Sequence, residues 1–161
     1  MHPLAIAVSA ALGASVEGTW HTPDARQVAE DVKAAVETAI DGFSVAERPI
    51  ARWLLVRATK PCGTVQVEVR AAELAIRCDE QQTAVAPSDG TPVAFAGNDG
   101  RELTLVHDVV DDRTVTQSFR SREGTRTNRL TLRPDGSLEV AVTIRSQRLS
   151  SPLEYTLTYL R

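Results

Sequence analysis

The chain has 161 residues, of which 42% are hydrophobic, 24% charged and 4% aromatic, and its formal net charge at pH 7 is −3. This length provides for one hydrophobic core but not for two separate domains of ordinary size. The weak negative charge and the few aromatic side chains argue against a nucleic-acid-binding protein, which needs a basic surface or a stacking platform.

The first 15 residues, MHPLAIAVSAALGAS, form the most apolar stretch of the chain. The stretch is too short to span a membrane, but it fits the apolar region of a secretory signal, with small residues near Gly13 and Ser15 where cleavage could occur. No Lys or Arg precedes it, so a buried strand or helix of the mature protein is the alternative. We expect an exported protein, secreted or periplasmic, in which residues 16–161 form a single domain.

A short strand at residues 16–20 (VEGTW) is followed at once by helical spacing. Thr22 or Asp24 can cap a helix there, and apolar residues then recur at helical intervals as far as Ile40. Gly42 is a natural helix end. The pattern predicts one amphipathic helix directly after the first strand.

A second, shorter helix is expected to begin between Glu47 and Pro49 and to end before Pro61. Its apolar run, residues 53–56 (WLLV), is equally compatible with a strand. We favour the helix.

From Gly63 onward the hydrophobic period changes to two, which is typical of strands. TVQVEV and ELAIRC form one hairpin, TAVAP and PVAFAG are weaker strands, and five longer ones come after them: RELTLVHDVV, RTVTQSFRS, TRTNRLTLR, SLEVAVTIRS and LEYTLTYLR. Short turns rich in Gly and Asp connect them, and such connections require antiparallel pairing. The predicted fold is mainly β: an antiparallel meander β-barrel of about 8–10 strands, with a helix or helix-turn-helix inserted after the first strand.

Alternation along the last five strands gives one apolar face that carries a few polar insertions. The interpretation is a cavity for a small ligand, in which these insertions orient the guest. The candidate ligand-binding residues are His107, Gln117, Asn128, Tyr155 and Tyr159, with Phe119 as an apolar wall. The alternative is that these polar groups are satisfied by one another, by the backbone or by buried water.

Two other functions have weaker support. A barrel-based isomerase or cyclase would use His107 as its acid or base, because an imidazole titrates near neutrality. The sequence contains no nucleophile elbow, metal-ligand cluster, phosphate loop or pair of inward carboxylates, so we expect no catalytic residue, no cofactor and no metal.

The third function is an interaction domain. Eight arginines lie between residues 113 and 148 against three acidic residues; the arginines are Arg113, Arg120, Arg122, Arg126, Arg129, Arg133, Arg145 and Arg148. This basic sheet surface could contact an anionic partner or lipid headgroups, or it could be balanced by the acidic first helix. We expect a monomer or a weak dimer.

The two cysteines, Cys62 and Cys78, flank the first hairpin of the meander. Export would permit a disulfide between them. Cys78 is in phase with the inward residues of its strand and Cys62 is out of phase, which argues against the bond, although Pro61 could reset the phase. The sequence leaves the bond open.

The order of a Gly-Thr-Trp strand, a helix-turn-helix and a long meander, from Val16 to Arg161, resembles the fatty-acid-binding branch of the calycins. The resemblance implies that Trp20 closes the barrel base beside a basic residue of the last strand, here Arg161. Tyr159 is similar to the tyrosine near the end of that family's pattern. The family's carboxylate-binding arginine would fall two residues earlier, where this chain has Leu157.

The chain also resembles small exported bacterial lipocalin-like proteins of unassigned activity. Four sequence segments carry this resemblance: RPIAR, DGTPV, QSFRSREGTRTN and SPLEYTLTYLR. Together the patterns and the resemblance imply binding or carriage of a small, largely apolar ligand. Because Leu157 stands where the family has its arginine, the resemblance does not extend to binding of a fatty-acid carboxylate by that arginine.

Overall fold

The computed structural model describes residues 16–161, so the expected signal segment lies outside the described residues. Strand β1 (Gly18–His21) is followed by two helices, α2 (Ala25–Ile40) and α3 (Arg48–Ala58). The helix-turn-helix expected after the first strand is therefore present. Within the described residues, no helix combines the length and the apolar character needed to cross a membrane.

Helix α2 begins as its sequence predicts. The Asp24 carboxylate accepts hydrogen bonds from the backbone N–H groups of Arg26 and Gln27, which satisfies two donors that have no partner inside the helix. One face of α2 is buried against the rest of the molecule, and it consists of Val32, Val36, Ala39 and Ile40.

Helix α3 confirms the helical interpretation of residues 53–56. Pro49 occupies its first turn, where a missing N–H costs nothing. Only Ala51 of this helix is buried, and its larger apolar side chains are mostly turned to solvent: Ile50, Trp53, Leu54 and Val56. The helix therefore lies on the molecule with much of its apolar surface uncovered.

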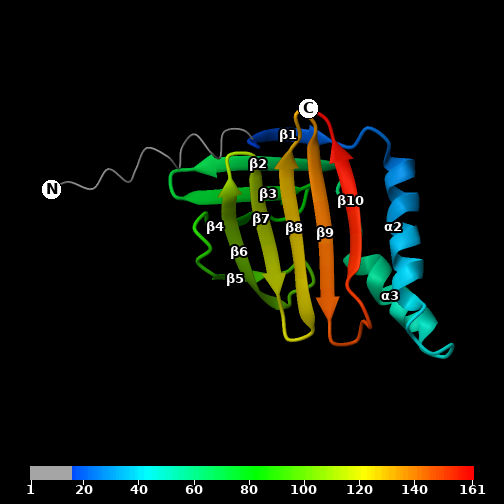
Figure 1. Cartoon of the computed structure of the whole chain (residues 1–161). Helices are drawn as coiled ribbons and strands as arrows, with labels where there is room; N and C mark the ends of the chain where they lie inside the picture. The colour runs from blue at the N-terminus through cyan, green and yellow to red at the C-terminus, as the bar shows by residue number, and fades with distance from the viewer. Residues whose placement is uncertain (1–15) are drawn as a thin grey trace.

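Nine further strands complete the chain, and Figure 1 shows them crossing one another in two layers. Their bounds are β2 (Thr64–Arg70), β3 (Glu73–Cys78), β4 (Ala84–Pro87), β5 (Val93–Ala96), β6 (Glu102–Asp111), β7 (Thr114–Arg120), β8 (Gly124–Leu132), β9 (Leu138–Ser146) and β10 (Leu153–Tyr159). One sheet has the order β1-β2-β3-β4 and the other β10-β9-β8-β7-β6-β5, and every pair is antiparallel. The predicted antiparallel meander is confirmed.

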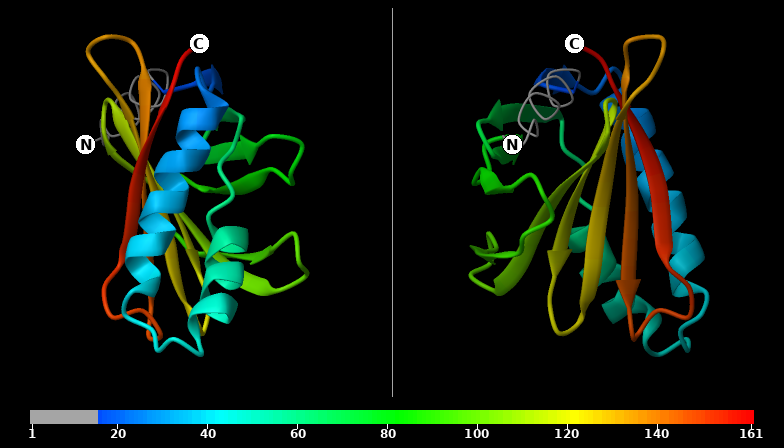
Figure 2. Two further views of the ribbon diagram at one scale, coloured as in Figure 1. Left: turned by 90° about the vertical axis from the view of Figure 1, so that its right-hand side faces the viewer. Right: turned by 60° about the vertical axis from the view of Figure 1, so that its left-hand side comes forward.

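The strands form two sheets rather than one continuous closed sheet (Figure 2). At one edge His21 and Leu160 exchange two backbone hydrogen bonds of 2.6 and 2.8 Å. At the other edge the β4–β5 connection meets β6, where Gly90 N–H donates to His107 C=O and Val109 N–H donates to Ser88 C=O. A few bonds at each edge thus replace the full ladder that complete closure would require.

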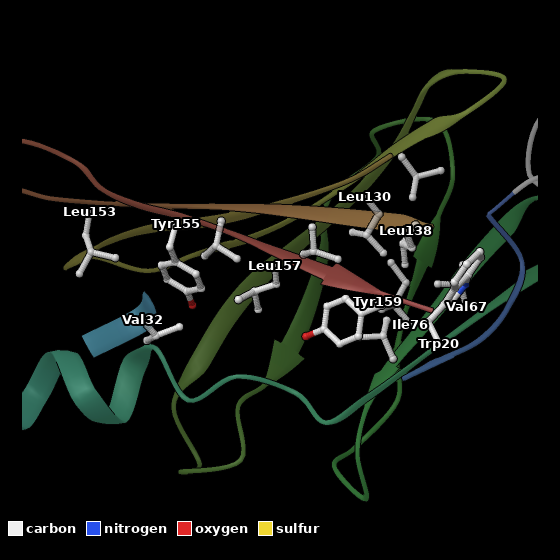
Figure 3. Packing of buried hydrophobic residues seen from close by; sticks show 14 of the residues in the cluster. Trp20, Val32, Val67, Ile76, Leu130, Leu138, Leu153, Tyr155, Leu157 and Tyr159 are labelled. Carbon is white, nitrogen blue, oxygen red and sulfur yellow. The ribbon is translucent and has the colours of Figure 1, made fainter. Parts of the chain in front are cut away.

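The larger hydrophobic cluster joins α2, the first sheet and the inner face of β8–β10. Figure 3 shows Leu153, Tyr155, Leu157 and Tyr159 projecting from the same side of β10, with Val32 of α2 nearby. A smaller cluster lies where β4, β5, β6 and β7 face one another, and its members are Ala84, Ala86 and Leu105 with Val93, Phe95 and Phe119 packed against them.

Trp20 lies in the core at the β1 end of the molecule. Its indole N–H donates to Val16 C=O at 3.0 Å, and the Arg161 guanidinium lies 4.7 Å from the ring centroid. Arg161 also donates to the carbonyl of Glu17 at 3.4 Å. The two ends of the described chain therefore meet at this tryptophan.

Cys62 and Cys78 form a disulfide with a Cα–Cα distance of 5.3 Å. Cys62 precedes β2, so the alternation of that strand does not govern the direction of its side chain. The phase argument against the bond fails for this reason. The bridge attaches the α3–β2 connection to the end of β3.

Candidate ligand-binding site

The second sheet presents its inner face as a series of transverse rows. Register pairs one row of Leu105, Phe119, Arg126, Ile144 and Leu153, and a second row of His107, Gln117, Asn128, Val142 and Tyr155. A third row is wholly apolar and contains Val109, Val115, Leu130, Val140 and Leu157. The predicted inward residues His107, Gln117, Asn128 and Tyr155 therefore share one row, with Phe119 in the row beside it.

Four polar side chains of the first two rows form a continuous hydrogen-bonded chain. Arg126 Nε donates to Asn128 Oδ1 at 3.1 Å, and Asn128 Nδ2 donates to Gln117 Oε1 at 2.9 Å. Gln117 Nε2 then lies 3.2 Å from His107 Nε2. The last link spans the two sheets, because His107 Nδ1 lies 2.8 Å from the carbonyl oxygen of Leu74 on β3.

The direction of this chain is fixed by chemistry at both ends. A carbonyl oxygen only accepts, so His107 Nδ1 must carry the hydrogen, and in the neutral ring Nε2 is then an acceptor for Gln117. A guanidinium only donates, so Asn128 must turn its oxygen toward Arg126. In this one arrangement every link of the hydrogen-bonded chain joins a donor to an acceptor.

The two ends of the hydrogen-bonded chain differ in how deeply their side chains are buried. The His107 side chain is fully buried and Gln117 nearly so, whereas Asn128 and Arg126 are half-buried. Loss of hydration on burial lowers the pKa of His107 below its ordinary value of 6.5, and hydrogen bonding to the backbone of Leu74 and Ala86 opposes that effect. Both ring nitrogens of His107 are already hydrogen-bonded, which leaves neither available to a substrate.

Arg126 is a site residue that the sequence-based prediction misses. The sequence groups it with the basic sheet surface, but its register partners Phe119 and Ile144 lie on the inner face. The available signal is the alternation itself, because Arg126 is in phase with Asn128 and Leu130. In the sequence-based interpretation its charge outweighs its phase.

The charge of Arg126 is not balanced by a neighbouring carboxylate. None of the six ion pairs found within residues 16–161 includes it. Its two hydrogen bonds go to neutral oxygens, those of Asn128 and of the Ala58 carbonyl at 2.8 Å. Three of the five guanidinium N–H groups therefore remain for another acceptor.

Local structure fixes where Arg126 stands. Strand β8 begins at Gly124, where an added Cβ would overlap the carbonyl oxygen of Arg145 on β9. Only glycine permits that close approach of the two strands. Two residues later the alternation turns Arg126 inward, beside the last turn of α3.

Tyr155 and Tyr159 face the interior, but their hydroxyls already have partners. Tyr159 donates to the carbonyl of Cys62 at 2.9 Å, and Tyr155 reaches the carbonyl of Thr59 at 3.5 Å. Burial raises the pKa of both phenols, so both remain protonated donors at neutral pH. Both side chains hold the connection between α3 and β2 against β10.

Phe119 and Phe95 give the smaller cluster its aromatic wall. Their ring centroids are 5.6 Å apart with a tilt of 53° between the planes, and both side chains are half-buried. Ala84 and Ala86 of the first sheet belong to the same cluster and have small side chains. Phe119 and Leu105 of this region belong to the same row as Arg126.

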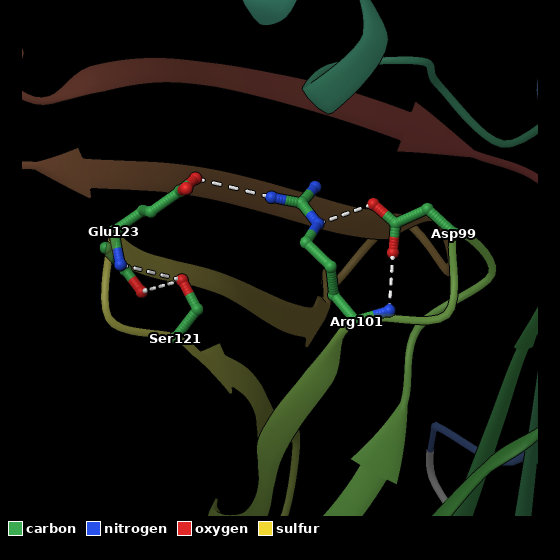
Figure 4. Close-up of polar contacts among 5 residues, drawn as sticks. Asp99, Arg101, Ser121 and Glu123 are labelled. Carbon is green, nitrogen blue, oxygen red and sulfur yellow. Dashed lines mark hydrogen bonds and ion pairs between the residues drawn. The ribbon is translucent and has the colours of Figure 1, made fainter.

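Ion pairs connect the turns at this end of the second sheet (Figure 4). Arg101 contacts Asp99 at 2.6 Å in its own turn and Glu123 of the β7–β8 turn at 3.3 Å. In the neighbouring turn the Ser121 hydroxyl accepts from Glu123 N–H. Exposed pairs of this kind contribute little stability, about 0–1 kcal/mol each, and here they hold the rim beside Phe119 in place.

Two hollows at the surface of the described residues lie near β10. One, of about 240 Å³, lies between α2 and the start of β10, and the other, of about 210 Å³, lies in the β9–β10 connection. Neither is lined by a member of the polar chain.

Ten antiparallel strands with a helix-turn-helix after the first define the fold of the fatty-acid-binding proteins, and comparison with solved structures shows this fold. The chain is similar to the REP1-NXSQ fatty acid transporter, with a TM-score of 0.57, 12% identity, and coverage of 92% of this chain and 96% of that one. It is also similar to a Schistosoma mansoni fatty acid binding protein in complex with arachidonic acid, at a TM-score of 0.54, 16% identity, and coverage of 93% and 98%. A third similar structure is As-p18, an extracellular fatty acid binding protein, at 0.51, 12%, and coverage of 93% and 98%.

The comparisons of the amino-acid sequence with protein families and with curated proteins found no similarity. No family model matches the chain, and no curated protein matches it. The fold of the fatty-acid-binding proteins, expected from the order of the elements, is thus confirmed by three-dimensional similarity alone.

Proposed function

We propose that this protein binds and carries a small, largely apolar molecule that bears one anionic group. The observation that carries the proposal is Arg126, a half-buried cation on the inner face with no acidic partner among the described residues. Arg126 is the one charged residue in a row that is otherwise apolar, and a partly buried charge without a partner is costly unless an opposite charge can reach it.

The apolar part of the guest lies against Phe119 and Phe95, and its anionic group accepts hydrogen bonds from Arg126. A planar guanidinium with three remaining N–H groups suits a carboxylate, sulfonate or phosphate oxygen pair. The similar solved structures support a ligand of this class, since one is described in complex with arachidonic acid. Leu157 is buried in the apolar row, so the anion is placed at Arg126 on β8 and not at β10.

The test is binding of dodecanesulfonate, whose charge does not change with pH, against dodecanol, which has the same chain length and no charge. Calorimetry with the delipidated protein should show preference for the sulfonate. Arg126→Met should weaken sulfonate binding by about tenfold or more, because a charge-assisted hydrogen bond is lost, and should leave dodecanol binding unchanged.

Arg129→Met is the matched control, because it removes one charge from the same strand on the exposed face. Its sulfonate affinity should equal that of the wild type. Equal binding of both ligands, or an Arg126→Met variant with wild-type sulfonate affinity, would contradict the proposal. Mass spectrometry of molecules that co-purify from the native host would then identify the natural ligand.

We also propose that the protein is exported and that its first 15 residues are removed. The Cys62–Cys78 bridge supports this, because disulfides persist in oxidising compartments. The intact mass of the protein from its native host, measured after thiol alkylation, tests both points. A full-length mass with two alkylated thiols would reject export.

A further inference from the structure

We infer that the amide chain couples binding of an anion at Arg126 to uptake of a proton at His107. The inference rests on the proposed function, since it concerns how the same site is regulated. Its basis is the fixed direction of the hydrogen bonds from Arg126 through Asn128 and Gln117 to the imidazole.

Without an anion, the four side chains of the hydrogen-bonded chain have no arrangement among themselves that satisfies each link once His107 is protonated. A proton on Nε2 makes that atom a donor, so Gln117 must rotate its amide and present Oε1. The Gln117 amino group then faces Asn128, which must rotate in turn. The amino group of Asn128 finally points at Arg126, and two donors oppose each other there.

An anion between Asn128 and Arg126 removes that conflict. Its oxygens accept one hydrogen bond from the rotated Asn128 amino group and another from the guanidinium. Each link from His107 to Arg126 then joins a donor to an acceptor. The bond from His107 Nδ1 to the Leu74 carbonyl is kept in both states, because Nδ1 is a donor in the neutral and the charged ring alike.

The elements packed around His107 offer the added charge no other partner. On β6 itself Asp108 points to the opposite face, and Asp89 of the β4–β5 connection pairs with Asp108 through the backbone and accepts from Thr91 N–H. Strand β3 carries Glu73 and Arg77 out of phase with Leu74, while β4 and β5 carry no titratable side chain. In the same row stands the Tyr155 phenol, whose pKa is raised by burial and whose hydroxyl contacts Thr59.

Because the coupling is reciprocal, the sulfonate should bind more tightly as the pH falls. Burial lowers the pKa of His107 in the free protein, and the bound anion raises it, so binding takes up a proton in the interval between the two values. Between about pH 7.5 and pH 5.5 the affinity of the wild type for dodecanesulfonate should rise about fivefold or more, the usual lower range for such coupling. Calorimetry in two buffers of different ionisation enthalpy measures the protons taken up.

Gln117→Met distinguishes coupling through the hydrogen-bonded chain from simple electrostatic attraction between protonated His107 and the bound anion. It severs the relay and leaves His107 and Arg126 in place, so sulfonate should still bind but proton uptake should disappear. His107→Gln should also bind without proton uptake. Uptake that persists in Gln117→Met, or wild-type binding without uptake, overturns the inference and leaves the proposed function intact.

A measurement on the wild type alone covers the case in which these variants do not fold. Nitrogen-15 spectra of the His107 ring should show Nε2 unprotonated in the free protein at about pH 6.5 and protonated after dodecanesulfonate is added. An unprotonated Nε2 in the complex down to about pH 5 overturns the inference. No sulfonate binding at any pH would instead overturn the proposed function.

Discussion

At the scale of single residues, Arg126 determines how its neighbours are oriented. Asparagine and glutamine can each turn either end of the amide toward a partner, so a row of amides has no direction of its own. The guanidinium at one end and the Leu74 carbonyl at the other remove that freedom. His107 is consequently held as one tautomer in its neutral form.

The buried imidazole should make the protein less stable in mild acid. Because burial lowers the pKa of His107 in the folded state, the unfolded chain binds more protons there once the pH drops below the ordinary value of 6.5. The contribution is complete above that pH and is lost as the pH falls through the lowered folded pKa. Urea unfolding should therefore show a declining free energy of unfolding over this interval.

His107→Gln should flatten the decline, since no group titrates at that position. His21→Gln removes the exposed imidazole of β1 and should keep the wild-type profile. If the two variants show the same pH dependence, His107 is not the group responsible.

The alternation of apolar and polar residues along each strand predicts which face a side chain occupies, but not which side chains it contacts. Alternation placed His107, Gln117 and Asn128 on one face, and register brings them into one row. It could not show that their hydrogen bonds form a chain that ends at Arg126, because lateral neighbours depend on the register between strands. Tyr155 and Tyr159 also face inward, but the partners of their hydroxyls come from a connection remote in sequence.

At the scale of elements, the connection from α3 to β2 is fixed at several points. Tyr155, Tyr159 and the Cys62–Cys78 bridge attach it to β10 and β3, and Ala58 at the end of α3 accepts from Arg126. Helix α3 itself has only one buried residue. Its position is therefore fixed by the attachments of this connection together with the Arg52–Glu37 ion pair to α2.

Tyr159→Phe should destabilise the protein by about 1 kcal/mol, because the hydroxyl that donates a hydrogen bond to the Cys62 carbonyl is lost. Tyr155→Phe should cost less, since its hydrogen bond is long at 3.5 Å. Urea unfolding measures both free energies. Hydrogen exchange should be faster for the backbone amides around Gly63 in Tyr159→Phe only, and an equal increase in both variants would contradict this assignment.

The elements themselves were largely predictable because their signals are local. Asp24 caps α2, and turn residues such as Gly136, with a φ of 86°, mark the hairpins. The division into two sheets was not predictable, since it depends on how the β4–β5 connection meets β6. The disulfide was also left open, because Cys62 lies outside any strand.

At the scale of the whole molecule, the chain closes on itself through its last residues. Leu160 pairs with His21 across the edge of the first sheet, and Arg161 lies over Trp20. These contacts join segments about as far apart in sequence as the described chain allows. The first strand is therefore held by contacts with β2 on one side and with the chain end on the other.

Deletion of Leu160 and Arg161 should release β1 from the second sheet. The loss comprises two backbone hydrogen bonds, the long hydrogen bond from Arg161 to the Glu17 carbonyl and a cation–π contact, and we expect a decrease of about 2–3 kcal/mol in the free energy of unfolding. Arg161→Ala alone should cost less, about 1 kcal/mol. Chemical denaturation compares the three proteins, and a deletion as stable as the wild type would show that the chain end does not contribute to closure.

The two tryptophans give this protein an optical readout of its own. Trp20 is 0% exposed and Trp53 is 57% exposed, so a water-soluble quencher should reduce the emission of Trp53 while leaving that of Trp20. Trp53 stands on the helix whose last turn contacts Arg126, and Trp20 stands where the chain ends meet. Events near Arg126 and at the meeting point of the chain ends should therefore produce separate fluorescence signals in the unlabelled protein.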